Sequence, residues 1–223
     1  MEYRRTENPA IPAEIMLGKY STPVWIQSAW TEGEFAQYIR NNGCGHCCIA
    51  MAARLRGIDM DPYREYLLCR SLWGPPDAEK GQDHFLTVPG IEKILRHLGL
   101  SASCFGVAEG AQNQAADHII RCLQEGKLVI FISDPFRYPG NVFSTGYHYV
   151  LAVGIRADGK ILIANSSENT TKGGVQWVTR EQIAQSLYQG GEPNKSLTWG
   201  EIERFGQGCT YVVIDETEWT VSK

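Results

Sequence analysis

Apolar residues recur at helical spacing through the first half of the chain. Within residues 45–56, the i, i+3, i+4, i+7 positions of one helical face are held by Cys48, Met51, Ala52 and Leu55. Gly57 follows this run directly, where a left-handed C-terminal cap is expected. The pattern therefore predicts a helix at 45–56, and comparable runs predict further helices at 62–72, 88–98 and 114–125.

The second half of the chain changes to short apolar runs that are typical of strands. Residues 128–133 read LVIFIS, which predicts a buried strand. The runs at 147–155 and 160–164 flank Arg-Ala-Asp-Gly, and an Asp-Gly pair between two apolar runs indicates a hairpin. Two more strands are predicted at 174–178 and 209–214.

Between the last two predicted strands, Thr179 and Gln182 form a capping-box pattern that begins a helix reaching about residue 188. Helices crowded at the front and an antiparallel sheet behind them define an α+β fold. The chain of 223 residues is expected to be one domain over 1–223, since a domain takes roughly 100 to 200 residues.

Composition excludes several classes of function. The net charge is −4 at pH 7 and no basic stripe is present, so a nucleic acid is not an expected partner. No stretch approaches the roughly 18 to 20 apolar residues of a membrane span, and the start of the chain lacks the apolar run of a secretory signal. We therefore expect a cytoplasmic protein without membrane insertion. The seven cysteines lack the spacing of a disulfide framework, and we expect most of them to be reduced.

Cys44 stands where the first predicted helix begins, between Gly43 and Gly45. The unpaired amide groups of a helix N-terminus carry roughly half a positive charge, which favours a thiolate over a thiol. Glycine on each side leaves room for a substrate backbone to come close. The position suits a nucleophile, and a structural cysteine at a helix start is the alternative.

A thiolate nucleophile also needs an imidazole as proton acceptor and a third group that orients the ring. His148 is the best candidate, because it begins a predicted strand after the long loop 134–146, where we expect a sheet edge near solvent. If Ile155 pairs with Lys160 in the predicted hairpin, Asn165 lies diagonally from His148 on the same face. The register therefore predicts a Cys-His-Asn set.

Other readings of the same region stay open at this point. Cys44, His46, Cys47 and Cys48 form a cluster that zinc could use, although no second ligand pair of matching spacing follows. The aromatic residues of the 134–146 loop, Phe136, Tyr138 and Phe143, could form a cleft wall or could pack onto the domain. The other histidines, His84, His97 and His118, are expected to be ordinary surface or satisfied residues.

Several of these motifs resemble a known family. Asn42-Gly43-Cys44-Gly45 with its following helix is similar to the Gly-Cys-Gly-Pro segment of the peptidases that cleave double-glycine leaders from bacteriocins. The stretches Gly146 to Gly154, Lys160 to Asn165 and Gly126 to Ile130 resemble strands of the same family. This C39-like family is a bacterial branch of the papain-like cysteine peptidases, and the likeness spans about positions 25–180.

The resemblance implies a papain-like fold with N-terminal helices packed on a C-terminal antiparallel sheet. It implies Cys44 as nucleophile, His148 as general base and then acid, and Asn165 as the orienting group. Gln27, with the Cys44 backbone amide, would form the oxyanion hole, and Gln37 is the alternative glutamine. The chain departs from the family pattern with His46 in place of Pro, Asn165 in place of Asp, and an extra Tyr147 before the histidine.

The expected function is a thiol hydrolase that cleaves a peptide or related amide bond in a peptide or protein substrate, with no cofactor and no metal. An acyltransferase could use the same thioester, because the two activities differ in the acceptor that the cleft admits. A catalytically silent peptide-binding domain on the same fold is the alternative from outside catalysis. The sequence does not fix an oligomeric state.

Overall fold

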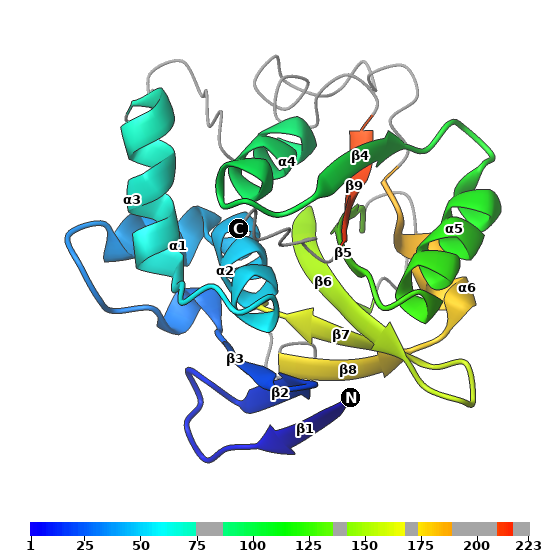
Figure 1. The fold of residues 1–223 in the computed structure, drawn as a ribbon, viewed down its shortest axis with the longest axis horizontal. Helices are drawn as coiled ribbons and strands as arrows, with labels where there is room; N and C mark the ends of the chain where they lie inside the picture. Colours follow the sequence, from blue (N-terminus) through cyan, green and yellow to red (C-terminus); the bar gives the residue numbers. More distant parts are fainter. Residues whose placement is uncertain (75–86, 136–141, 168–173, 189–208, 216–223) are drawn as a thin grey trace, which may run out of the picture.

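The computed structural model describes residues 1–74, 87–135, 142–167, 174–188 and 209–215. Four helices precede most of the strands, and two more lie among them (Figure 1). The helices are α1 (Ala36–Asn42), α2 (Cys44–Leu55), α3 (Pro62–Trp73), α4 (Val88–His97), α5 (Gln112–Gln124) and α6 (Arg180–Ser186), with a short 3-10 helix η1 (Gln27–Ala29). None of the helices in the described ranges combines the length and apolar character needed to cross a bilayer.

The main sheet has six strands in the order β4-β9-β5-β6-β7-β8, and every neighbouring pair is antiparallel. Its members are β4 (Ala102–Gly106), β5 (Leu128–Ser133), β6 (His148–Ile155), β7 (Ile161–Asn165), β8 (Gly174–Val178) and β9 (Cys209–Ile214). The predicted α+β fold is therefore confirmed, and the predicted strands in the second half all belong to this one sheet.

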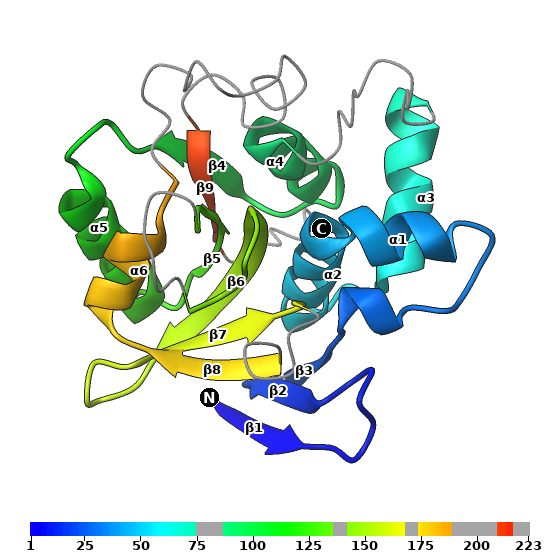
Figure 2. The ribbon, with the colours of Figure 1, turned by 180° about the vertical axis from the view of Figure 1, so that it is seen from behind.

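Helices cover both faces of the main sheet, with α2 and α4 on one face and α5 and α6 on the other (Figures 1 and 2). The apolar residues of β5 alternate between the two sides: Leu128, Ile130 and Ile132 join the core under α2, and Val129 and Phe131 join the core under α5. Burial on both faces explains why this strand is apolar at nearly every position.

A second, smaller sheet precedes the helices and was not predicted from the sequence. It contains β1 (Glu2–Arg5), β2 (Ala13–Leu17) and β3 (Tyr20–Val24) in the order β1-β2-β3. Its inner side chains, among them Ile15 and Val24, are fully buried in the core that also contains α2. α2 packs against β3 as well as β6, which places this helix at the centre of the molecule.

Residues at the ends of four helices have the conformations expected of helix caps. Gly57, Gly99 and Gly126 follow α2, α4 and α5 with positive φ angles, as left-handed caps do. The Thr179 side chain accepts from the Gln182 backbone amide while the Gln182 side chain reaches back, so the capping box at α6 is present.

Candidate active site

Cys44 is the first residue of α2, and Gly43 alone separates this helix from α1. The first amide groups of a helix have no intrahelical acceptor, so the positive end of the α2 dipole lies at Cys44. The Cys44 side chain is partly exposed, whereas Cys47 and Cys48, one turn further along, are fully buried. Burial raises the pKa of both of those thiols well above the ordinary value. Of the three, Cys44 is therefore the one that a substrate can reach.

Gly43 has a steric role at the α1–α2 junction. A Cβ atom at this position would lie 2.2 Å from the backbone oxygen of Ile39, which is far inside van der Waals contact. The Gly43 amide donates to the same oxygen at 2.7 Å. Because only glycine allows α1 to approach this closely, Gly43 fixes where α2 begins and where Cys44 sits.

His148 is the first residue of β6 and is buried, with 5% of its surface exposed. The expectation that it lies at a sheet edge near solvent is wrong, because β6 is a central strand between β5 and β7. The structure brings His148 together with Asn165: the ring Nε2 lies 2.9 Å from the Asn165 Oδ1. Asn165 is itself fully buried at the end of β7.

The hydrogen bonds around Asn165 fix the orientation of its amide. Nδ2 donates to the Phe143 carbonyl at 2.9 Å and to the Gln176 Oε1 at 3.2 Å, and Oδ1 accepts from the Ser167 backbone amide at 2.9 Å. Since Oδ1 can only accept, the Nε2 of His148 must carry the hydrogen in the bond between the two side chains. The other ring nitrogen, Nδ1, then keeps the lone pair that a general base needs.

Burial lowers the pKa of His148 to about 4, and the hydrogen bond with Asn165 opposes this shift. The imidazole is therefore neutral at pH 7 and able to accept a proton.

The β6–β7 hairpin, whose register predicted this pairing, contains an irregularity. Pairing begins with Ile155 opposite Ile161, one residue away from the predicted partner Lys160. A bulge at Val153 then shifts the register, so that Ala152 faces Ile163 and Leu151 faces Ala164. That is the predicted register at the end of the hairpin where His148 and Asn165 lie, although its start was predicted wrongly.

Contacts around Ser166 tie the start of α2 to the end of β7. The Ser166 hydroxyl is close enough to the buried Cys47 thiol to affect its pKa, and Cys47 lies one helical turn after Cys44. The Ser166 carbonyl accepts from the Gln27 backbone amide at 3.1 Å. Since Ser166 follows Asn165 directly, the first turn of α2 and Gln27 both contact the residue next to Asn165.

Gln27 and Gln37 differ sharply in their surroundings. Gln27 is buried, and its Nε2 donates to the carbonyl of Arg40, four residues before Cys44, at 3.3 Å. Its Oε1 has no hydrogen-bond partner among the described residues. Gln37 is exposed on α1, where its side chain bonds Arg40 and Asn41. The burial and position of Gln27 favour it over Gln37 as the glutamine of the site.

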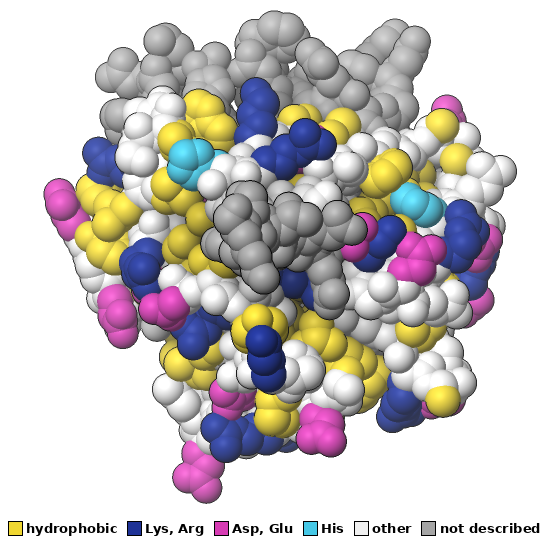
Figure 3. Space-filling model, viewed as in Figure 1, with side chains coloured by type: hydrophobic (Ala, Val, Ile, Leu, Met, Phe, Trp, Pro, Cys, Tyr) yellow, Lys and Arg dark blue, Asp and Glu magenta, His cyan; other side chains and the backbone are white. Residues whose placement is uncertain are grey.

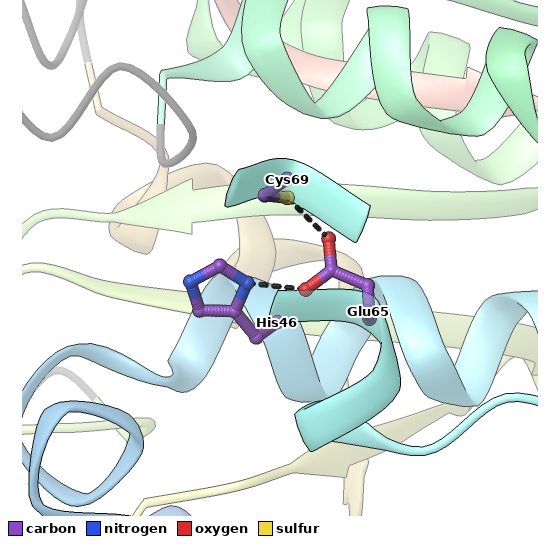
Figure 4. A group of neighbouring side chains, drawn as sticks. All are labelled: His46, Glu65 and Cys69. Atoms are coloured by element: carbon purple, nitrogen blue, oxygen red, sulfur yellow. Dashed lines mark hydrogen bonds and ion pairs between the residues drawn. The ribbon is translucent and has the colours of Figure 1, made fainter. Parts of the chain in front are cut away.

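A second group of polar side chains lies inside the helical layer, between α2 and α3 (Figure 4). His46, Glu65 and Cys69 are all fully buried. One Glu65 carboxylate oxygen is bonded to the His46 Nδ1, and the other accepts from the Cys69 thiol at 3.0 Å. Within the part of the chain that the structure describes, these three are the one group of three potential metal ligands whose atoms lie within 4.8 Å of one another.

The zinc cluster considered from the sequence therefore does not form, since His46 turns to Glu65 on α3 instead of joining Cys44. Both oxygens of Glu65 already serve as acceptors, and a structural zinc site would need a fourth ligand. In the sequence, the one feature that points to the His46–Glu65 pair is His46, which occupies a position where the resembled family has proline. Gln176 and Ser166 gave no comparable signal.

The aromatic loop residues are only partly described. Phe136 and Tyr138 lie outside the described residues, as does His84. Phe143 is fully buried and packs edge-on against Phe131, with ring centroids 5.5 Å apart. For Phe143 the packing alternative is thus correct, and its backbone carbonyl supports Asn165. His118 bonds the Tyr211 hydroxyl at 2.7 Å, as a satisfied histidine was expected to do.

An α+β fold, in which a helix that begins with a cysteine packs against strands that carry a hydrogen-bonded His-Asn pair, is the arrangement implied by the papain-like resemblance. Comparison with solved structures finds two similar chains. The chain is similar to a candidate C39-like peptidase from Bacillus anthracis, with 12% identity and a TM-score of 0.47, over 79% of this chain and 90% of that chain. It is also similar to a double-glycine motif protease from an AMS/PCAT transporter, solved in complex with the leader peptide, with 13% identity, a TM-score of 0.37, and coverage of 77% and 83%.

Comparisons at the level of sequence find nothing further: no family model matches the chain, and the search of curated proteins returns no significant match. Residue roles therefore rest on the geometry described above.

Proposed function

We propose that this protein is a thiol hydrolase that cleaves a peptide or related amide bond through a thioester on Cys44. The observation that carries the proposal is the His148–Asn165 pair, because the fixed amide of Asn165 leaves Nδ1 of a neutral imidazole as proton acceptor. A partly exposed cysteine at a helix N-terminus supplies the matching nucleophile.

In the first step, His148 Nδ1 accepts the Cys44 thiol proton while the sulfur attacks the substrate carbonyl carbon. The oxyanion that forms accepts from the Cys44 backbone amide and from the Gln27 Nε2, whose second hydrogen is not used by Arg40. The C–N bond then breaks as His148 gives its proton to the leaving amine, and a thioester on Cys44 remains.

In the second step, water replaces the departed amine. His148 takes a proton from this water, the hydroxide oxygen attacks the thioester carbon, and the C–S bond breaks. The sulfur recovers the proton from His148, which restores the resting thiol and neutral imidazole. Asn165 holds the ring through both steps, with Nε2–H donating to Oδ1 throughout.

The balance of surface charge is compatible with a peptide or protein substrate. Acidic and basic side chains are interspersed on the face shown in Figure 3, and the net charge is −4. That face has no large patch of one charge sign that would favour a polyanion or a polycation as partner.

The first experiment compares the labelling rates of the cysteines by iodoacetamide at pH 7, followed by peptide mapping. Cys44 is expected to react at least tenfold faster than Cys104 and Cys209, which are also partly exposed but lie on strands and not at a helix N-terminus. His148→Gln should slow the labelling of Cys44 alone, since glutamine fills similar space and retains an amide N–H for Asn165.

Equal rates for the three cysteines, or a Cys44 rate indifferent to His148, would contradict the proposal. A circular dichroism spectrum of His148→Gln that matches the parent shows that the loss is chemical and not structural.

The acyltransferase alternative predicts a different product from the same thioester. Incubation with a panel of peptides and increasing hydroxylamine separates the two, because transfer to the amine grows at the expense of hydrolysis only where the cleft admits that acceptor. A silent peptide-binding domain would give neither product and no selective labelling of Cys44.

A further inference from the structure

Two cysteines face each other on β4 and β9, the two strands at one edge of the main sheet, whereas His148 and Asn165 lie on β6 and β7. Cys104 on β4 and Cys209 on β9 have their sulfur atoms 3.4 Å apart. The strands pair antiparallel, and between Phe105 and Gly106 the register shifts so that Cys209, not Thr210, lies opposite Gly106. This bulge brings Cys209 onto the face of the sheet that Cys104 occupies.

The surroundings of the pair distinguish it from the other cysteines. Cys104 and Cys209 are both partly exposed and pack against the same core, the one under α2 and α4. Cys122 belongs to the core on the opposite face, where its thiol lies 3.5 Å from the His118 ring. Cys122 is therefore close in space to β9 yet separated from the pair by the sheet itself.

Glu92 on α4 completes the group. Its Oε2 accepts from the Cys104 thiol at 2.8 Å, and its Oε1 lies 2.8 Å from the guanidinium of Arg96. If the Cys104 hydrogen were removed, the carboxylate would keep Arg96 as its partner. Loss of the thiol proton therefore leaves no isolated charge behind.

We propose that Cys104 and Cys209 are an oxidative modification site, at which a low-molecular-weight disulfide converts the two thiols into a reversible disulfide that joins β4 to β9. The sulfur atoms need to approach from 3.4 Å to about 2.0 Å, within a ladder that already holds the two strands side by side.

The order of the two exchange steps follows from the environment of Cys104. Burial, and then the hydrogen bond with Glu92, raise the pKa of the Cys104 thiol to about 12, which makes it a poor first nucleophile. Cys209 therefore attacks the small disulfide first; its S–H proton goes to the departing thiolate, and a mixed disulfide forms. Cys104 then attacks the Cys209 sulfur and displaces the second small thiolate, which takes the Cys104 proton. Two electrons pass from the protein sulfurs to the reagent.

The consequence is a covalent tie between segments 105 residues apart in the sequence. Closing a loop of this length restricts the unfolded chain strongly, so the oxidised protein should melt roughly 5–15 °C higher than the reduced one. Cys44 lies on α2, outside β4 and β9, so its labelling rate should be the same in both forms.

The test uses the full chain with oxidised glutathione at pH 8, followed by peptide mapping without reduction. A peptide pair joined through Cys104 and Cys209 is expected, together with the rise in melting temperature and its reversal by dithiothreitol. Cys104→Ser should stop the reaction after the first step, with one glutathione held on Cys209. Cys209→Ser should leave Cys104 unmodified.

Cys122→Ser is the matched control and should still form the linked pair. Alkylation of both Cys104 and Cys209 after full exposure to oxidised glutathione would overturn the proposal, and so would a linkage of either one to another cysteine. The labelling rate of Cys44 is measured separately on the reduced protein, so failure of this proposal is distinguishable from failure of the proposed hydrolase.

Discussion

α2 contributes to two groups that have almost the same composition and opposite character. One is the proposed active site, Cys44 with His148 and Asn165 from the sheet, and the other contains His46, with Glu65 and Cys69 from α3. Each has a cysteine, a histidine and a side-chain oxygen that accepts a hydrogen bond. Only the first has a partly exposed sulfur.

The two groups differ in the spatial order of their three side chains. In the buried group the carboxylate of Glu65 lies between the ring and the thiol and accepts from each, so the imidazole does not face the sulfur (Figure 4). In the candidate site the acceptor Asn165 lies behind the ring, which leaves Nδ1 available on the other side. We propose that Cys44 lies on that side of the ring, because catalysis needs the histidine between its orienting group and the nucleophile.

The largest expected effect comes from breaking the buried group. Glu65→Ala removes the shared acceptor of His46 and Cys69 at a fully buried position, so the free energy of unfolding should fall by about 3–5 kcal/mol. Urea unfolding followed by circular dichroism measures the loss. The folded fraction should still label at Cys44 at the parent rate.

Glu65→Gln is the matched control, because it keeps the volume and one oxygen acceptor, and its loss of stability should be smaller. If Glu65→Ala left stability unchanged, the buried group would not be the structural element described here. A selective loss of Cys44 labelling in folded Glu65→Ala would instead show that the buried group influences the reactivity of Cys44.

The comparison also separates what the sequence could predict from what it could not. The start of α2 at Cys44, the hairpin and the His148–Asn165 pairing were predictable, because helix caps, Asp-Gly turns and strand alternation are local signals. Glu65 and Cys69 as partners of His46 depend on how α3 packs on α2, and no local pattern encodes that contact.

The small N-terminal sheet was missed for a related reason. β3 contains Pro23, which usually argues against a strand, and β1 has mostly exposed side chains without an apolar alternation. Pairing with β2 and burial against α2 stabilise these segments in spite of weak local preferences. The burial of His148 was likewise unpredictable, since strand order places β6 in the middle of the sheet.

The next largest expected effect is a pH dependence of stability that arises from His148. The pKa of His148 is about 4 in the folded protein and about 6.5 in an unfolded chain, so below pH 6.5 the unfolded state binds a proton that the folded state does not. Stability should therefore fall between about pH 6.5 and pH 4, by about 3 kcal/mol in total. Urea unfolding at a series of pH values measures this slope.

His148→Gln should flatten that part of the curve, because glutamine does not titrate. A parent and variant with parallel curves between pH 6.5 and 4 would show that the buried imidazole does not have the depressed pKa. His46→Gln is the companion variant from the buried group, and it should leave the contribution of His148 in place.

The smallest effect tests the orientation of the Asn165 amide. Gln176 on β8 accepts from the Asn165 Nδ2 and donates its own amide to the Val142 carbonyl, so it positions Asn165 without being part of the reacting set. Gln176→Met removes both bonds at similar volume and should lower the Cys44 labelling rate by about tenfold, which corresponds to one hydrogen bond. Gln176→Glu keeps the acceptor for Asn165 and should recover most of the rate. If Gln176 were only structural, both variants would lose the same stability and would label at Cys44 at the same rate. The Phe143 carbonyl and the Ser167 amide would then be sufficient to orient Asn165.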